Sequence, residues 1–394
     1  MELNVEAVQG YLRKEGLDGW LLYDFQGLNP IAQRVAPFGG IVTRRWFLLV
    51  PASGRPVLLA HKIEEGNVAA GRAELRTYSG WRELEGELRK LLGGLSSVAM
   101  EYSPGNAIPY VSRVDAGTLE LVRSTGVEVA SSANLVQHFQ ARWTPEGLAS
   151  HREAAAFLVG LVAEMFELAA GAVARGESLS EYDLQREILR RFAGAGMVYE
   201  HPPIVAVGPN AANPHYEPTA ETHLPIREGD LLLLDIFCRR EGADTVQADI
   251  TWTAYVGRPP VPPRMLEVFA VVVAARDRGV ELIGERLAAG DQVSGWEVDD
   301  AVREVIVGAG YGEYFTHRTG HSLGTEVHGN GANIDNLETR DERVLEPGLG
   351  FTIEPGVYLP GEFGIRSEID CYIGEGGLEV TTLPLQRELR PLLS

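Results

Sequence analysis

Four carboxylates interrupt apolar segments that otherwise have the composition of buried strands. They are Asp235 in LLLLDIF, Asp249 in ADITWT, Glu354 in FTIEPGVY and Glu368 in GIRSEID. A carboxylate buried in such surroundings without a partner would cost on the order of several kcal/mol, so each needs a cation, a hydrogen-bond network or a bound proton. A fold that gathers all four at one site would satisfy them together.

Side-chain alternation along strands allows these acids to converge. Asp235 shares a face with its neighbours two positions away, and Glu368 shares one with Arg366 and Asp370. A single acid of this kind is more often a strand-end residue that faces water or pairs with an arginine. Four acids with few arginines beside them are explained more directly by a pair of divalent cations.

Three of the nine histidines fall within one short segment, at His317, His321 and His328. The ordinary explanations are a helix face that carries His317 and His321, or hydrogen-bonded core histidines. Three glycines in the same segment argue against a helix, because each costs roughly 1 kcal/mol in a helix interior. A turn-rich segment whose backbone approaches a ligand is the better interpretation.

Carboxylates together with imidazole form a hard, oxygen-rich ligand set. Such a set suits Mn²⁺ and also holds Co²⁺, Zn²⁺ or Fe²⁺. One cation would leave excess negative charge, whereas two cations about 3.5 to 4 Å apart activate water and stabilise an oxyanion. The two cysteines, Cys238 and Cys371, form neither a disulfide framework nor a zinc-binding pattern, and strand alternation points them away from the acids. The sequence therefore predicts hydrolysis at a site with two metal ions.

Two domains are the simplest division of a chain of 394 residues, which exceeds the size of one ordinary core. The first, residues 1–143, has the pattern of an α/β domain. A helix is predicted near Val5–Lys14, and strands at 20–23, 46–50 and 57–60. Thr144 then offers an N-cap, and Pro145 the first position, of a long alanine-rich helix.

The second domain, residues 144–394, begins with helices and changes to strands broken by glycine and proline. Helices are predicted at 145–175, 179–193, 263–287 and 298–309. The last two helices separate an early strand pair from a late one. This order predicts an α+β domain with helices packed on an antiparallel sheet.

The net charge of −20 excludes whole classes of partner. It would repel phosphate backbones and anionic lipid surfaces, so neither nucleic acid nor a membrane is expected to bind. The first residues lack the features of a secretory signal, and apolar runs such as Val268–Ala275 are too short to span a bilayer. We therefore expect a cytoplasmic location.

Five ordered elements resemble the pita-bread metallopeptidases, which include prolidase, aminopeptidase P and methionine aminopeptidase. They are Asp235 in an apolar strand, Asp249 in DITWT, His321 in TGHSLG, Glu354 in TIEPGVY and Glu368 in GIRSE. The N-terminal part is similar to the extra domain of the prolidase and creatinase branch, so the resemblance spans nearly the whole chain. It implies a creatinase-like α/β domain, a pita-bread catalytic domain with helices on a curved antiparallel sheet, a homodimer, and Xaa-Pro dipeptidase (prolidase) activity.

The resemblance also implies a role for each of the five residues. Asp235, Asp249 and Glu368 would hold one metal ion. Asp249 and Glu368 would bridge to a second ion, bound also by His321 and Glu354. A hydroxide between the ions would be the nucleophile, and Glu354 would accept its proton and pass it to the leaving nitrogen.

Further residues are implied around the substrate. His328 would help to stabilise the tetrahedral intermediate, with His215 and His317 on the proline side. Arg366 either orients Glu368 or binds a substrate carboxylate, and the first interpretation is preferred.

Several departures from the family pattern bear on these assignments. The connection from Asp235 to Asp249 is longer than usual, which makes Asp244 a rival for the first ligand. Thr325 and Gly329 stand where the family has an aliphatic residue and an acid, so the wall of the substrate pocket is expected to differ.

The main alternative to a dipeptidase is an aminopeptidase P acting on longer Xaa-Pro peptides. A charged group that pairs with the proline carboxylate would mark a dipeptidase, and Arg34, Arg44 and Arg45 are candidates. A creatinase-like, metal-free amidinohydrolase would not be expected to keep all five ligands. A catalytically inactive protein-binding scaffold would be expected to have lost some of them.

Overall fold

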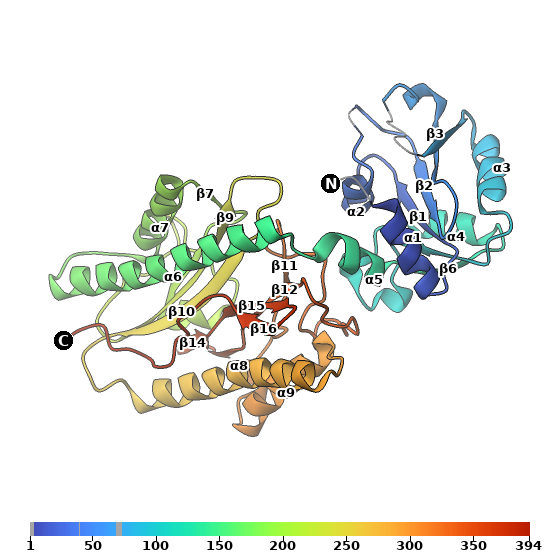
Figure 1. Cartoon of the computed structure of the whole chain (residues 1–394). Helices are drawn as coiled ribbons and strands as arrows, with labels where there is room; N and C mark the ends of the chain where they lie inside the picture. Colours follow the sequence, from blue (N-terminus) through green and yellow to red (C-terminus); the bar gives the residue numbers. More distant parts are fainter. Residues whose placement is uncertain (1–3, 39, 68–72) are drawn as a thin grey trace. The chain divides into compact units, whose positions relative to one another are not determined.

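The computed structural model describes residues 4–38, 40–67 and 73–394. The chain divides into two compact units, Met1–Gln140 and Ala141–Ser394, each with hydrophobic clusters of its own (Figure 1). The sequence placed the junction between residues 143 and 144, just after this division.

The first unit is built on a six-stranded mixed sheet. Its strands are β1 (Gly19–Asp24), β2 (Trp46–Pro51), β3 (Val57–His61), β4 (Glu74–Tyr78), β5 (Ser97–Met100) and β6 (Glu128–Ser131). They lie in the order β4-β3-β2-β1-β5-β6, with β2 antiparallel to both neighbours and every other pair parallel. The strands predicted from apolar runs in this region are confirmed, because strands covered on both faces are apolar throughout.

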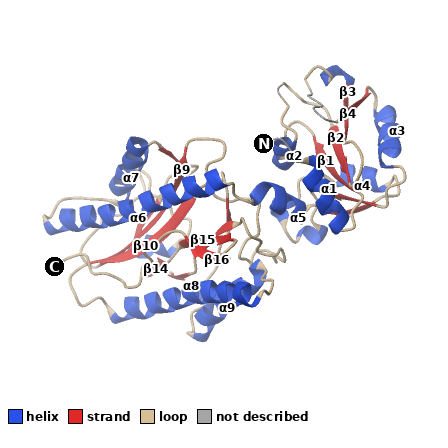
Figure 2. Cartoon of the chain, in the orientation of Figure 1, coloured by secondary structure: helices blue, strands red, loops and turns tan. Residues whose placement is uncertain are grey.

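Helices cover both faces of this sheet. They are α1 (Val5–Lys14), α2 (Pro30–Val35), α3 (Trp81–Leu92), α4 (Ala116–Arg123) and α5 (Ala133–Val136). Along β1, Leu21 packs in the cluster that includes α3 and α4, and Leu22 in the cluster that includes α1 and α2. Figure 2 shows helices on both sides of these strands. The predicted helix Val5–Lys14 is confirmed at both ends. At its N-terminus the Asn4 side chain caps the helix by accepting a hydrogen bond from the Ala7 N–H.

The second unit is α+β, as predicted. Its helices are α6 (Pro145–Ala174), α7 (Glu181–Ala195), α8 (Pro263–Ala289) and α9 (Gly295–Gly308). Its strands are β7 (Met197–Val198), β8 (Ile204–Val207), β9 (Asp230–Arg240), β10 (Ala248–Val256), β11 (Ser322–Leu323), β12 (Gly350–Ile353), β13 (Gly356–Leu359), β14 (Phe363–Arg366), β15 (Ile369–Gly374) and β16 (Gly377–Val380).

Two similar halves make up this unit. Helices α6 and α7 pack on the sheet of β9 and β10, and α8 and α9 pack on the strands from β12 to β15 (Figure 1). The predicted start of α6 is confirmed, because the Thr144 side chain caps it and Pro145 occupies its first position. α7 begins with a capping box between Ser180 and Asp183.

Helix α6 corrects one expectation. We expected no apolar run long enough to span a bilayer, but α6 has 30 residues and a mean hydropathy of 1.8 over its most apolar window. Its most apolar part combines alanines with bulky residues such as Phe157 and Leu161. Residues such as Leu158, Val162 and Met165 are fully covered by other parts of the same unit, so α6 is the core helix of a folded domain.

Candidate metal centre

The β9 and β10 hairpin brings the first two acids onto one face. Asp235 lies opposite Thr251, and Asp249 lies opposite Phe237, so both carboxylates project from the same side of the pair. Asp235 is 7% and Asp249 4% exposed. The rival Asp244 is exposed in the loop that joins the two strands.

Backbone contacts bring the second half of the unit to this face. The N–H of Glu368 donates to the carbonyl oxygen of Thr251 on β10 at 3.1 Å. The N–H of Glu354 donates to the carbonyl oxygen of Thr319 at 2.7 Å, two residues before His321. These two bonds hold residues from widely separated segments beside the hairpin.

The expected ligands come within a few ångströms of one another. The His321 Nε2 atom is 3.4 Å from Glu354 Oε1 and 3.7 Å from Asp249 Oδ2. Asp249, His321 and Glu368 each offer a ligand atom within 4.8 Å of the others. Asp235 joins the group through Arg366, which donates to its Oδ2 atom.

Electrostatics indicate that the cluster is incomplete without cations. Burial, together with the neighbouring acids, raises the pKa of Asp249 and of Glu368 well above the ordinary value. Burial raises the pKa of Glu354 to about 7. The Oδ1 atom of Asp249 is buried and has no hydrogen-bond partner among the described residues. Burial also lowers the pKa of His321, which favours the neutral imidazole that binds metals.

A metal pair fits these residues. Three buried carboxylates, the partly buried Glu354 and one neutral imidazole supply oxygen and nitrogen ligands of the kind that Mn²⁺, Co²⁺ or Zn²⁺ accept. The unpartnered Oδ1 atom of Asp249 is an acceptor that a cation would satisfy. The same residues would repel one another strongly with nothing between them.

Arg366 orients the acids through a partner that the sequence did not indicate. Its guanidinium donates to Asp235, to the Thr251 hydroxyl at 2.9 Å and to the Tyr358 hydroxyl at 3.1 Å. The Thr251 hydroxyl in turn donates to Glu368 Oε2 at 2.6 Å. Arg366 thus reaches Glu368 through Thr251. The carboxylate to which it donates directly is Asp235, and its Nε atom also lies 4.0 Å from Glu354 Oε2. Residues 367 and 368 lie outside both neighbouring strands, so simple alternation does not set the direction of Glu368.

His317 has both ring nitrogens engaged by the protein. Its Nδ1–H donates to the Arg318 carbonyl oxygen at 2.6 Å, so its Nε2 accepts from the Tyr358 hydroxyl at 2.7 Å. Burial lowers the pKa of His317 to about 3. His317 is therefore a neutral ring fixed beside the Tyr358 and Arg366 network.

His328 and His215 lie at the outer side of the centre. The His328 ring packs edge-on against the His321 ring, with 4.5 Å between centroids. Burial lowers the pKa of His328 to about 4, and the charges of Arg318, His215 and His201 act in the same direction. The sequence analysis did not single out His201 or Arg318, whose charges act on His328.

Glu181 fastens the loop that carries His215, and the sequence pattern did not reveal it. This carboxylate is fully buried at the start of α7. It accepts hydrogen bonds from the N–H groups of Val207 and Leu224, the Asn210 amide and the Tyr216 hydroxyl, at 2.6 to 3.1 Å. The only signal was its place in the first helical turn, which suits any acid.

Asp299 fastens the segment that carries His317 and His321 by accepting hydrogen bonds from its backbone. It is fully buried on α9 and accepts from the Thr319 N–H at 3.0 Å and the Asn336 N–H at 2.9 Å. Arg303 donates to it from one turn further along the helix. Asp299 on the preceding helix therefore fixes the position of the backbone at residues 319–321.

The two cysteines and Gly329, which departs from the family pattern, have local explanations. Cys238 and Cys371 are unpaired and buried in separate hydrophobic clusters. A Cβ atom at Gly329 would lie 3.0 Å from Ser322 Oγ and 3.1 Å from the Leu323 carbonyl carbon, so little space exists there for an acidic side chain.

The comparisons with known proteins agree with this architecture. The sequence model of metallopeptidase family M24 matches residues 149–375, more than half of the chain. The chain belongs to metallopeptidase family M24. The resemblance to the pita-bread metallopeptidases is thereby confirmed.

Curated relatives match over part of their length. The chain is 37% identical over 168 residues to the Xaa-Pro dipeptidase of Lactobacillus delbrueckii subsp. lactis, covering 43% of this chain and 40% of that protein. It is 35% identical over 166 residues to a putative Xaa-Pro aminopeptidase of Mycoplasma pneumoniae, covering 42% of each. The matched segments thus span less than half of these relatives.

Solved structures match over the whole chain. A dipeptidase from Pyrococcus horikoshii OT3 has a TM-score of 0.61 at 26% identity and is covered completely, as is this chain. A dipeptidase from Mycobacterium ulcerans has a TM-score of 0.71 at 21% identity, covering 100% of this chain and 99% of that one. The second likeness establishes the two-domain M24 fold.

Proposed function

We propose that this M24 protein hydrolyses the bond preceding proline in Xaa-Pro dipeptides, using a pair of divalent cations, most suitably Mn²⁺. The observation that carries the proposal is the close approach of Asp249, His321, Glu354 and Glu368, with the buried Oδ1 atom of Asp249 left without a hydrogen-bond partner among the described residues. Relatives named Xaa-Pro dipeptidase support the choice of substrate.

The protein's own residues supply the remaining chemistry. When bound, the cations would activate water and polarise the scissile carbonyl group. Glu354, whose Oε1 atom lies 3.4 Å from His321 Nε2, would accept a proton from that water and return it to the leaving nitrogen. Arg366 and Thr251 hold Asp235 and Glu368 in place by hydrogen bonds. His328, at the outer side, is positioned to contact the substrate.

Two substitutions in the same hairpin test the metal assignment. Asp249→Asn is expected to lose bound metal and Xaa-Pro hydrolysis together, because it removes a charged ligand from the centre. Asp244→Asn removes the same charge from an exposed loop residue and is expected to keep both. Metal content measured by mass spectrometry, together with proline release, distinguishes the two. Full activity in Asp249→Asn, or loss in Asp244→Asn, would overturn the assignment.

Substrate length separates the proposal from its nearest alternative. We expect an Ala-Pro dipeptide to be cleaved with a higher kcat/KM than an Ala-Pro-Ala tripeptide of the same N-terminus. The reverse order would make the protein an aminopeptidase P, as in the relatives named Xaa-Pro aminopeptidase.

We also propose a homodimer, by resemblance, and a cytoplasmic location, by composition. Light scattering of the purified protein and fractionation of cells test these two proposals.

A further inference from the structure

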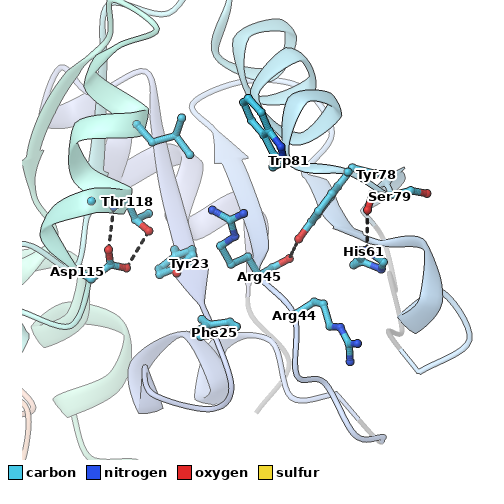
Figure 3. A pocket seen from close by; sticks show the side chains of 13 residues that line it. Tyr23, Phe25, Arg44, Arg45, His61, Tyr78, Ser79, Trp81, Asp115 and Thr118 are labelled. Atoms are coloured by element: carbon cyan, nitrogen blue, oxygen red, sulfur yellow. Dashed lines mark hydrogen bonds between the residues drawn. The ribbon is translucent and has the colours of Figure 1, made fainter.

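A cavity of about 830 Å³ lies within the first unit. It opens where β1, β3 and β4 end and where α3 and α4 begin (Figure 3). In sheets of mainly parallel strands, ligands bind outside the carboxyl ends of the strands, because the connecting loops leave crevices there. The cavity therefore lies where ligands bind in sheets of this kind.

Two adjacent arginines give the cavity a positive charge. Arg44 and Arg45 both line it, and neither guanidinium forms an ion pair with any carboxylate of the described residues. Figure 3 shows Arg45 in the middle, with Tyr23 and Thr118 on one side and Tyr78 and Trp81 on the other. Asp115 is the single lining acid, and both of its oxygens accept hydrogen bonds from Thr118 at the start of α4.

The backbone of the arginine segment is held rigidly. The buried carboxylate of Glu64 accepts hydrogen bonds from the N–H of Thr43 at 2.6 Å and of Arg44 at 3.1 Å. The Tyr78 hydroxyl donates to the Arg45 carbonyl oxygen at 2.7 Å. These bonds use backbone groups of Arg44 and Arg45 and fix the segment that carries both guanidinium groups. The Arg44 guanidinium donates to Thr43 Oγ1 at 2.6 Å, and the Arg45 side chain lies beside the Tyr78 hydroxyl. A pre-organised positive group of this kind binds an anion without a large ordering cost.

Aromatic side chains form part of the wall. Trp81 is 55% and Phe25 37% exposed, and both line the cavity. Exposed aromatic rings beside a cation suit a ligand that combines an anionic group with a flat apolar body. α3 also begins at Trp81 without a side-chain cap, so the positive end of its dipole adds to the field of the arginines.

We propose that this cavity binds a small organic anion, with a phosphate or carboxylate on Arg45 and Arg44 and a planar ring beside Trp81. All residues that line the cavity belong to the first unit, whereas the residues of the metal centre belong to the second. Because the chain carries a net charge of −20, a positive cavity is a local exception that general composition does not explain.

Direct binding tests the proposal on the full-length, metal-loaded protein. Phenyl phosphate and benzoate serve as probes that differ in the anionic group. Inorganic phosphate lacks the ring, and benzylamine has the ring with the opposite charge. Calorimetric titration at low salt is expected to show saturable binding of at least one ring-bearing anion, weaker binding of inorganic phosphate and none of benzylamine. The stronger ring-bearing probe identifies the anionic group.

Variants separate the cavity from other sites. Arg45→Gln is expected to weaken binding of the stronger probe at least ~10-fold, the scale of one lost charged hydrogen bond. Arg89→Gln removes an exposed arginine in the last turn of α3 and is expected to bind normally. Asp249→Asn, which disrupts the metal centre, should retain the probe. The proposal fails if neither ring-bearing anion binds, if Arg45→Gln binds like Arg89→Gln, or if Asp249→Asn abolishes binding.

Discussion

Replacing Gly320 by alanine tests how tightly the histidine segment is packed against the strand that leads to Glu354. A Cβ atom at this position would lie 2.0 Å from the carbonyl oxygen of Thr352 and 2.8 Å from its carbonyl carbon. Gly320 is also paired on its other side with Ile334, through hydrogen bonds of 3.0 and 3.1 Å. The segment has backbone on both sides, so it cannot move away from Thr352 without breaking this pairing.

The size of the effect follows from these contacts. The two backbones must separate by about 1 Å, and overpacking of this kind costs about 1 to 3 kcal/mol. For a unit of this size, 2 kcal/mol corresponds to a fall in Tm of roughly 4 to 8 °C. His321 follows Gly320 directly, and its carbonyl oxygen accepts from the Thr352 N–H at 2.8 Å. Displacement of this ligand should lower metal affinity by roughly 10- to 100-fold.

Gly324→Ala is the matched control in the same segment. Its Cβ atom would lie 3.8 Å from the nearest atoms, which is ordinary contact, and we expect a change in Tm of no more than about 2 °C. Thermal unfolding with and without added Mn²⁺, and a metal titration, provide the measurements. Equal Tm and equal metal affinity in the two variants would refute the packing argument.

Three further predictions concern buried side chains that can gain or lose a proton. Glu181→Gln is expected to reduce kcat/KM for Xaa-Pro substrates roughly 10-fold, because the loop that carries His215 loses a charged acceptor of several hydrogen bonds. His151 has its pKa lowered from 6.5 to about 4 by burial, so the unfolded state binds a proton first, and stability should fall by up to about 3 kcal/mol as pH drops from 6.5 to 4. His151→Gln should show a smaller loss over that range in urea titrations. Chelation of the metals should lower Tm more at pH 8 than at pH 6. Burial and mutual repulsion raise the pKa of Asp249 and of Glu368 in the metal-free fold. The metal-free protein therefore loses folding stability as the pH rises and these two carboxylates ionise.

Each of these predictions has a control or a contradicting result. Glu177→Gln removes an exposed acid and should leave kcat/KM unchanged. An equal effect of Glu181→Gln and Glu177→Gln would remove the positioning role of Glu181. Exposed His223 replaced by glutamine should keep the acid sensitivity of the parent. A chelation effect that does not change with pH would contradict the repulsion argument.

The sequence predicted the features that depend on a few consecutive residues. The start of α6 is set by Thr144 and Pro145, whose capping oxygen and fixed backbone angle act within one turn. Short apolar runs predicted the first three strands because those strands are covered on both faces. The motifs around Asp249 and His321 likewise carried the family resemblance, since each motif lies within a few consecutive residues.

The partners of those residues were decided only by the tertiary structure. Arg366 meets Asp235 across 131 positions of sequence, although sequence spacing suggested Glu368. Glu181 and Asp299 hold loops whose positions depend on how helices pack on the sheets. Periodicity along one segment determines which face a side chain takes, but not which distant segment lies opposite. That choice depends on strand register and helix packing across the whole unit, which no local pattern encodes.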